Sequence, residues 1–195
     1  MKYYLLSIAA AFMVFAASAQ DNPTSGNGIA LGIKAGVNFA TLSNDPSNNV
    51  KARIGFHAGG FVEIPIFDKF SIQPEILYSA QGDKSGSPSS KTNLDYLIIP
   101  VMAKYYIKEG FSLEVGPQGG FLLSAKDKGD GYNEDIKDAV ESTDFGVNFG
   151  VGYKMETGLS FNVRYNLGLS HVDKYDGPTI NNRVFLISIG YNFLN

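Results

Sequence analysis

The sequence contains no cysteine and no tryptophan, and it has only two histidines among 195 residues. Without cysteine, the chain can form no disulfide bond, no thiol nucleophile and no thiolate metal site. Its formal net charge of −3 at pH 7 gives it no basic footprint of the kind that binds nucleic acid. These absences exclude disulfide-stabilised, thiol-based and nucleic-acid-binding functions.

Long apolar runs are also lacking, except at the N-terminus. Lys2 precedes an apolar stretch from Leu5 to Ala17, and the small residues Ala17-Ser18-Ala19 end it. The stretch is short for a membrane span and ends in a typical cleavage site, so we expect residues 1–19 to be a secretory signal peptide. A retained anchor helix is the alternative. No later stretch approaches the roughly 20 apolar residues of a transmembrane helix, so a mature chain in a membrane must be a barrel.

Strict alternation of apolar and polar residues is what the sequence does contain. It is clearest in LSFNVRYNLGLS, at residues 159–170. Successive side chains of a strand point to opposite faces, so this segment has one apolar and one polar face. The predicted strands are 29–39, 53–65, 69–81, 94–107, 111–125, 143–156, 158–170 and 183–194.

The connections between these strands alternate in length. Tight turns are predicted at 67–69, 108–110 and 156–158, and long polar loops at 40–52, 82–93, 126–142 and 171–182. Bacterial outer-membrane barrels have an even number of strands, with short periplasmic turns and longer extracellular loops. We therefore predict an all-β, eight-stranded antiparallel up-and-down transmembrane β-barrel of this kind. It would occupy residues 29–195, after a short periplasmic segment at 20–28.

The two faces of the last three predicted strands differ in composition. One face carries large apolar residues such as Phe161 and Tyr165, while the other carries glycine and hydrogen-bonding residues such as Asn162. A soluble core built from the second set would lack apolar volume. It would also leave the aromatic rings in water, at about 25 cal/mol per Å². The apolar face is therefore expected to face lipid, and the polar face the barrel interior.

The same alternation places charged side chains inside the barrel. An eight-stranded barrel is just wide enough to be filled by side chains, and buried charges persist only when they are paired. We therefore predict a structural network of ion pairs that closes the interior, with inward glycines such as Gly36 and Gly116 making room for it. Its predicted members are Lys34, Glu63, Glu75, Lys104, Glu114, Lys154 and Arg164.

Aromatic residues and prolines add two further expectations. Outward-facing Phe and Tyr gather near both ends of the predicted strands, which is typical of the two interfacial girdles of a membrane barrel. Pro74, Pro100 and Pro117 lie inside three consecutive strands, where each removes a donor from the hydrogen-bond ladder. We expect bulges to accommodate these prolines.

Seven segments in order, from about Gly32 to Phe193, resemble the outer-membrane β-barrel family of Bacteroidetes that includes PorT-like proteins. They are GIKAGVNFATL, FSIQPEILYSAQG, YLIIPVMAKYY, VGPQGGFLLSAK, DFGVNFGVGYKM, LSFNVRYNLGLS and NRVFLISIGYNF. The resemblance implies a barrel fold and a location in the cell outer membrane. Most members have no assigned biochemical activity, and a few PorT-like ones are linked to protein secretion and maturation at the cell surface.

Residues capable of catalysis are few. His57 lies on the inner face of the second predicted strand and His171 opens the last loop, and neither has a serine and a carboxylate at a spacing that would bring them together. Residues 127–135, DKGDGYNED, have the composition of a calcium loop but not its spacing. We predict no catalytic residue, no cofactor and no metal site.

The leading hypothesis is a non-enzymatic integral outer-membrane protein whose polar loops serve structure, adhesion or partner docking. A PorT-like accessory of protein secretion or transport is the alternative, and a lipid-modifying outer-membrane enzyme is the third hypothesis. The expected partners are outer-membrane lipid and, through the long loops, secretion-machinery or surface proteins, but no nucleic acid.

Overall fold

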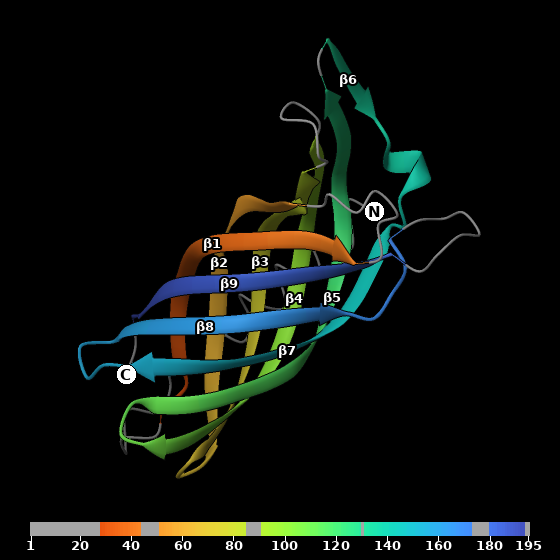
Figure 1. Ribbon diagram of the computed structural model, residues 1–195. Helices are drawn as coiled ribbons and strands as arrows, with labels where there is room; N and C mark the ends of the chain where they lie inside the picture. The colour runs from red at the N-terminus through yellow and green to blue at the C-terminus, as the bar shows by residue number, and fades with distance from the viewer. Residues whose placement is uncertain (1–27, 44–50, 85–90, 130, 173–179, 194–195) are drawn as a thin grey trace.

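The computed structural model describes residues 28–43, 51–84, 91–129, 131–172 and 180–193. These residues form an antiparallel sheet that closes on itself as a barrel (Figure 1). Each strand of the wall pairs with the next one along the chain, and the first pairs with the last. The wall strands are β1 (Ala30–Ser43), β2 (Lys51–Phe67), β3 (Phe70–Lys84), β4 (Lys91–Lys108), β5 (Phe111–Gly129), β7 (Thr143–Lys154), β8 (Leu159–Gly168) and β9 (Asn181–Asn192). The predicted eight-stranded antiparallel barrel is confirmed.

Several predicted features lie outside the described residues. They are the signal peptide at 1–19, all but residue 28 of the segment at 20–28, and the parts of three loops at 44–50, 85–90 and 173–179. Among the residues that are described, none belongs to a helix long and apolar enough to cross a membrane.

Short and long connections lie at opposite ends of the barrel. The predicted tight turns join β2 to β3, β4 to β5 and β7 to β8. Gly110 and Gly158 have φ values of 76° and 85°, a left-handed conformation that glycine adopts without steric cost. The backbone N–H of Asn192, at the end of β9, donates to Gly158, so the last strand ends beside these turns. We call this end of the barrel the turn end and the opposite one the loop end.

Strands extend further into the predicted loops than the sequence indicated. β4 begins at Lys91 and β5 continues to Gly129. The loop predicted at 126–142 contains a short strand, β6 (Tyr132–Asp135), which pairs with the end of β5, and a 3₁₀ turn, η2 (Lys137–Ala139). The β5–β6 hairpin projects beyond the rest of the wall (Figure 1). Its residues are polar on both faces, so they lack the apolar alternation by which a strand is recognised.

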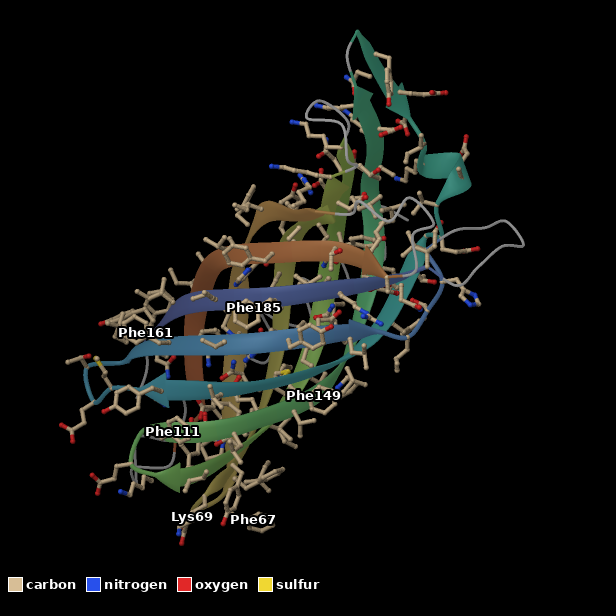
Figure 2. All side chains as sticks on the ribbon, viewed as in Figure 1. Phe67, Lys69, Phe111, Phe149, Phe161 and Phe185 are labelled. Carbon is tan, nitrogen blue, oxygen red and sulfur yellow. The ribbon has the colours of Figure 1, made fainter. Side chains whose placement is uncertain are left out.

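The two faces of the wall are oriented as predicted. Phe161 of β8 is 43% exposed, whereas its neighbours Asn162 and Arg164 are each 4% exposed. Figure 2 shows Phe149, Phe161 and Phe185 on three adjacent strands, and all three rings lie on the outer surface of the barrel. Monomeric soluble proteins rarely expose contiguous apolar surface on this scale, so hydrocarbon is the environment that suits the outer wall.

Outward aromatic rings pack in pairs at both ends of the wall. Near the loop end, the ring centroids lie 6.3 Å apart in Phe39–Phe185 and 5.4 Å apart in Phe56–Tyr78. Near the turn end, they lie 6.4 Å apart in Phe67–Phe70 and 5.6 Å apart in Tyr191–Phe193. Aromatic rings prefer the interface between hydrocarbon and water. The pairs therefore lie where two interfacial girdles are needed.

The three prolines inside strands do not lie at bulges, so that prediction is wrong. In the β3–β4 ladder, two consecutive residue pairs are missing between Pro74 and Leu77, and Pro100 lies on the opposite strand there. In the β4–β5 ladder, two consecutive residue pairs are missing at Pro117. Both ladders resume in the same register on the far side. Proline lacks an N–H and so interrupts the ladder without shifting it.

Candidate functional site

The seven predicted charged residues meet inside the barrel, in the half nearer the turn end. Six of them are at most 4% exposed, and each comes from a different strand: Lys34 (β1), Glu63 (β2), Glu75 (β3), Lys104 (β4), Glu114 (β5) and Arg164 (β8). The seventh, Lys154 of β7, has a side chain that is 25% exposed. Every wall strand except β9 therefore contributes one charged side chain.

Arg164 is the centre of the first part of this network. Its Nη2 lies 2.8 Å from Glu75 Oε1, and its Nε donates to Glu114 Oε2 at 2.7 Å. Lys34 Nζ also donates to Glu75 Oε1, at 2.9 Å. The bonds donated by Arg164 Nε and Lys34 Nζ are charge-assisted hydrogen bonds, which are roughly twice as strong as neutral ones, and the Nη2 contact is an ion pair. Arg164 thus joins a carboxylate of β5, two strands away, to a carboxylate of β3, on the far side of the barrel.

Lys104 connects the second part of the network to the first. Its Nζ lies 3.6 Å from Glu114 Oε1 and 3.5 Å from Glu63 Oε2. Glu63 Oε2 in turn lies 3.6 Å from Lys154 Nζ, near the turn end. All seven predicted residues therefore form one continuous chain of ion pairs across the interior.

Neutral side chains donate additional hydrogen bonds to the carboxylates. Gln73 donates to Glu75 Oε1 at 2.6 Å, Asn162 donates to Glu114 Oε1 at 2.8 Å, and the Tyr106 hydroxyl donates to Glu63. Such bonds offset part of the cost of removing charges from water. Tyr106 was not predicted as a member. Its even-numbered place on β4, which it shares with inward-facing Lys104, was the signal that could have identified it.

His57 belongs to a separate hydrogen-bonded group inside the barrel. Its Nδ1 lies 2.7 Å from Asn38 Oδ1 and its Nε2 lies 2.8 Å from Ser188 Oγ. The sequence argument did not anticipate Ser188 beside His57, which the pairing of β9 with β1 brings about, but the third member of the group is the amide of Asn38 and not a carboxylate. His171, the other histidine, is exposed between β8 and β9.

A serine, a histidine and an amide in this order have the connectivity of a hydrolase triad. Asn38, His57 and Ser188 are, however, at most 5% exposed, and none of them lines a cavity found among the described residues. A catalytic serine must reach the atom it attacks. We interpret the group as a structural hydrogen-bond chain within the packed interior.

Glycine makes room for some of these inner side chains. A Cβ added to Gly36 would lie 2.6 Å from the His57 ring and 2.1 Å from the Ile187 carbonyl oxygen. One added to Gly150 would lie 2.6 Å from Arg164 Cγ and 2.5 Å from the Val163 carbonyl oxygen. At Gly116 the nearest atoms all belong to the backbone, and a Cβ would lie 2.0 Å from the Val101 carbonyl oxygen. An inner side chain therefore needs the glycine at Gly36, where backbone limits the space as well, whereas at Gly116 backbone is the limit.

The loop-end half of the interior contains an apolar cluster, which the sequence argument did not predict. That argument rested on the polar inner face of the last three strands, whereas β3, β4 and β5 carry large apolar residues at inward positions. The buried cluster contains Leu77, Leu94, Tyr96, Ile98, Leu122, Ala125, Val140 and Val172. The interior is thus filled at both ends, by ion pairs near the turns and by apolar packing near the loops.

Within the part of the chain that the structure describes, no three His, Asp or Glu side chains are grouped so as to hold a metal ion. The cavity beside Glu63, Tyr106 and Lys154, of about 350 Å³, opens at the turn end.

A closed barrel with an apolar outer wall and a filled interior defines a small integral protein of the bacterial outer membrane. Residues 18–174 match the family described as outer membrane protein beta-barrel domain, and the chain belongs to this family.

Solved structures of two bacterial proteins share the fold. The Neisserial surface protein A (NspA) superposes with a TM-score of 0.60 at 14% sequence identity, over 85% of this chain and 99% of that one. Ail, the attachment invasion locus protein of Yersinia pestis, superposes with a TM-score of 0.53 at 15% identity, over 84% of this chain and 98% of that one. No curated protein sequence matches the chain. At these identities the likeness concerns the fold.

Proposed function

We propose that this protein is a non-enzymatic structural or surface-interaction protein whose partners bind at the loop end. The filled interior is the observation that supports this proposal, because the ion pairs around Arg164 and the apolar cluster around Leu94 occupy the path that a solute would take. A barrel that transports nothing acts through its surfaces.

The orientation in the membrane is part of the proposal. Residues 1–19 would be removed as a signal peptide, and residues 20–28 and the turn end would face the periplasm. The loop end, with its β5–β6 hairpin, would then face the outside of the cell, as long loops do in other outer-membrane barrels.

Two neighbours in fold suggest what kind of role such a barrel can have. NspA is described as a surface protein, and Ail as an attachment invasion locus protein that has been crystallised with the heparin analogue sucrose octasulfate. A surface-contact role for this chain agrees with these descriptions.

The second candidate is an accessory of protein secretion. The seven segments from Gly32 to Phe193 that resemble PorT-like proteins of Bacteroidetes favour it. Co-purification of secretion-machine subunits with the intact barrel would distinguish this role from a stand-alone one. A lipid-modifying enzyme is less well supported, because His57 and Ser188 are buried.

Electrical recording tests the filled interior. The purified protein, inserted in a planar lipid bilayer, is expected to show no steady conductance at neutral pH. An open porin inserted under the same conditions serves as the control for detection. Steady openings by the folded wild-type protein would contradict the proposal, because they would require a continuous water-filled path past Arg164.

A further inference from the structure

A row of lysines crosses the outer side of the wall beyond the loop-end aromatic rings. The register places Lys84 of β3 opposite Lys91 of β4, and Lys91 opposite Lys128 of β5. Directly opposed residues of antiparallel strands point to the same face, with Cβ atoms about 4.5–5.5 Å apart. Lys126 lies two residues before Lys128 and shares its face. We call Lys84, Lys91, Lys126 and Lys128 the lysine row.

Little negative charge compensates the row. Among the residues that the structure describes, none of its four ammonium groups forms an ion pair. Asp135 lies opposite Lys126, but its carboxylate also accepts a hydrogen bond from the backbone N–H of Lys137. Like charges directly opposite one another destabilise a sheet. An arrangement of this kind is stabilised by an anion bound from outside.

The row lies on the lipid side of the wall. β4 alternates without a break, so Lys91 points to the same side as Val101, which is 41% exposed on the outer surface. Three of the four residues that point the other way at this height are acidic: Asp83, Asp127 and Glu134, with Thr92 between the first two. The projecting sheet is therefore basic on the face that continues the lipid-facing wall and acidic on the opposite face.

The height of the row indicates which part of a lipid it meets. Leu97 of β4 pairs with Tyr78 of the loop-end girdle. Lys91 lies about 20 Å further along the strand, at about 3.3 Å per residue. With a strand tilt of about 40°, this corresponds to roughly 15 Å above the girdle. The outer leaflet of this membrane carries glycolipids with phosphorylated saccharide headgroups, which extend to this height.

We propose that the lysine row binds the phosphorylated saccharide headgroup of an outer-leaflet glycolipid. Ammonium groups bind phosphate as point charges and need no single fixed geometry, which suits a row of flexible lysines. The lipid-side position favours this occupant over a soluble polyanion, which could approach any face. The proposal depends on the outer-membrane location and not on the filled interior or on a protein partner.

The test compares two double variants of the full-length protein that lose the same charge. Lys91→Gln/Lys128→Gln removes the centre of the row, and Lys69→Gln/Lys108→Gln removes two exposed lysines at the turn end. The probe is fluorescently labelled lipopolysaccharide with a phosphorylated core, added to protein in neutral detergent micelles. Heat-modifiable migration on a denaturing gel verifies that each variant is folded.

We expect the row variant to bind this probe about 30-fold more weakly than wild type, since each lysine near an anionic lipid surface contributes about fivefold. The turn-end variant should bind like wild type, and dephosphorylation of the probe should weaken wild-type binding to the level of the row variant. Equal binding by wild type and the row variant, or an equal loss in the turn-end variant, would overturn the proposal. Heparin oligosaccharide that displaces the probe completely at an equal concentration would overturn the assignment to a lipid.

Discussion

Replacement of Arg164 by methionine is expected to lower the free energy of unfolding by about 3–5 kcal/mol. Arg164 holds Glu75 at 2.8 Å and Glu114 at 2.7 Å inside the barrel, and methionine would leave these carboxylates without their shared cation. Of these two carboxylates, the ammonium group of Lys34 contacts only Glu75 and that of Lys104 contacts only Glu114, so neither bridges them as Arg164 does. A buried charge that loses its partner costs far more than an exposed one.

Urea unfolding in lipid vesicles, followed by far-ultraviolet circular dichroism, measures this change, because the chain has no tryptophan for fluorescence. Arg183→Met is the matched control. Arg183 lies on β9, next to β8, but is exposed on the outer side near the loop end. Its replacement is expected to change stability by no more than about 0.5 kcal/mol. Similar losses in both variants would mean that Arg164 is not buried in the network.

Replacement of Val163 by arginine is expected to cost about 2–4 kcal/mol in a lipid bilayer. Val163 faces outward at the middle of β8 and pairs with Val151 of β7 and Ile187 of β9, both apolar and also outward. An arginine there would place a charge near the midplane of the hydrocarbon, where water cannot solvate it.

The control is the same substitution nearer the surface of the membrane. Leu169→Arg places the same charge just beyond the loop-end terminus of β8, where Leu169 is 61% exposed. The cost of a charge falls to about 0–1 kcal/mol near the interface. Unfolding of both variants in vesicles should therefore show a difference of about 2 kcal/mol or more. Equal costs would contradict the assignment of Val163 to the bilayer interior.

The wall of this barrel could be predicted from the sequence because its two faces meet different environments. Residues such as Phe161 and Asn162 alternate between lipid and a polar interior, so the period of two is strong in β7, β8 and β9. The same parity predicted seven inward-facing charged residues, and the structure places their side chains in one chain of ion pairs. The alternation of two residues along each strand therefore predicted both the barrel fold and the charged residues that face its interior.

The pairings within the network could not be predicted. Lys34 bonds Glu75, 41 residues away, and Arg164 bonds Glu114, 50 residues away. These contacts depend on the stagger of strands around the barrel, which alternation along one strand does not specify. The contact between His57 and Ser188 was missed for the same reason, since it depends on the register between β1 and β9.

Two other features escaped prediction because their strands depart from the general pattern. The ends of β4 and β5 and the whole of β6 have polar residues on both faces, so they looked like loops. Inward positions of β3 to β5 near the loop end carry Leu77, Leu94 and Ile98, so an apolar cluster fills part of the interior there. The polar inner face of β7 to β9 was a poor guide to the opposite wall.

Collision accessibility of nitroxide labels tests the orientation of the wall most directly. The chain has no native cysteine, so single cysteines at successive positions from Leu159 to Ser170 can each carry one label in vesicles. We expect contact with oxygen, which is soluble in hydrocarbon, to peak at Phe161, Val163 and Tyr165. A water-soluble nickel chelate should reach these three labels poorly. The account would be contradicted by the opposite result: high accessibility to the chelate at positions 161 and 165, and high accessibility to oxygen at positions 162 and 164.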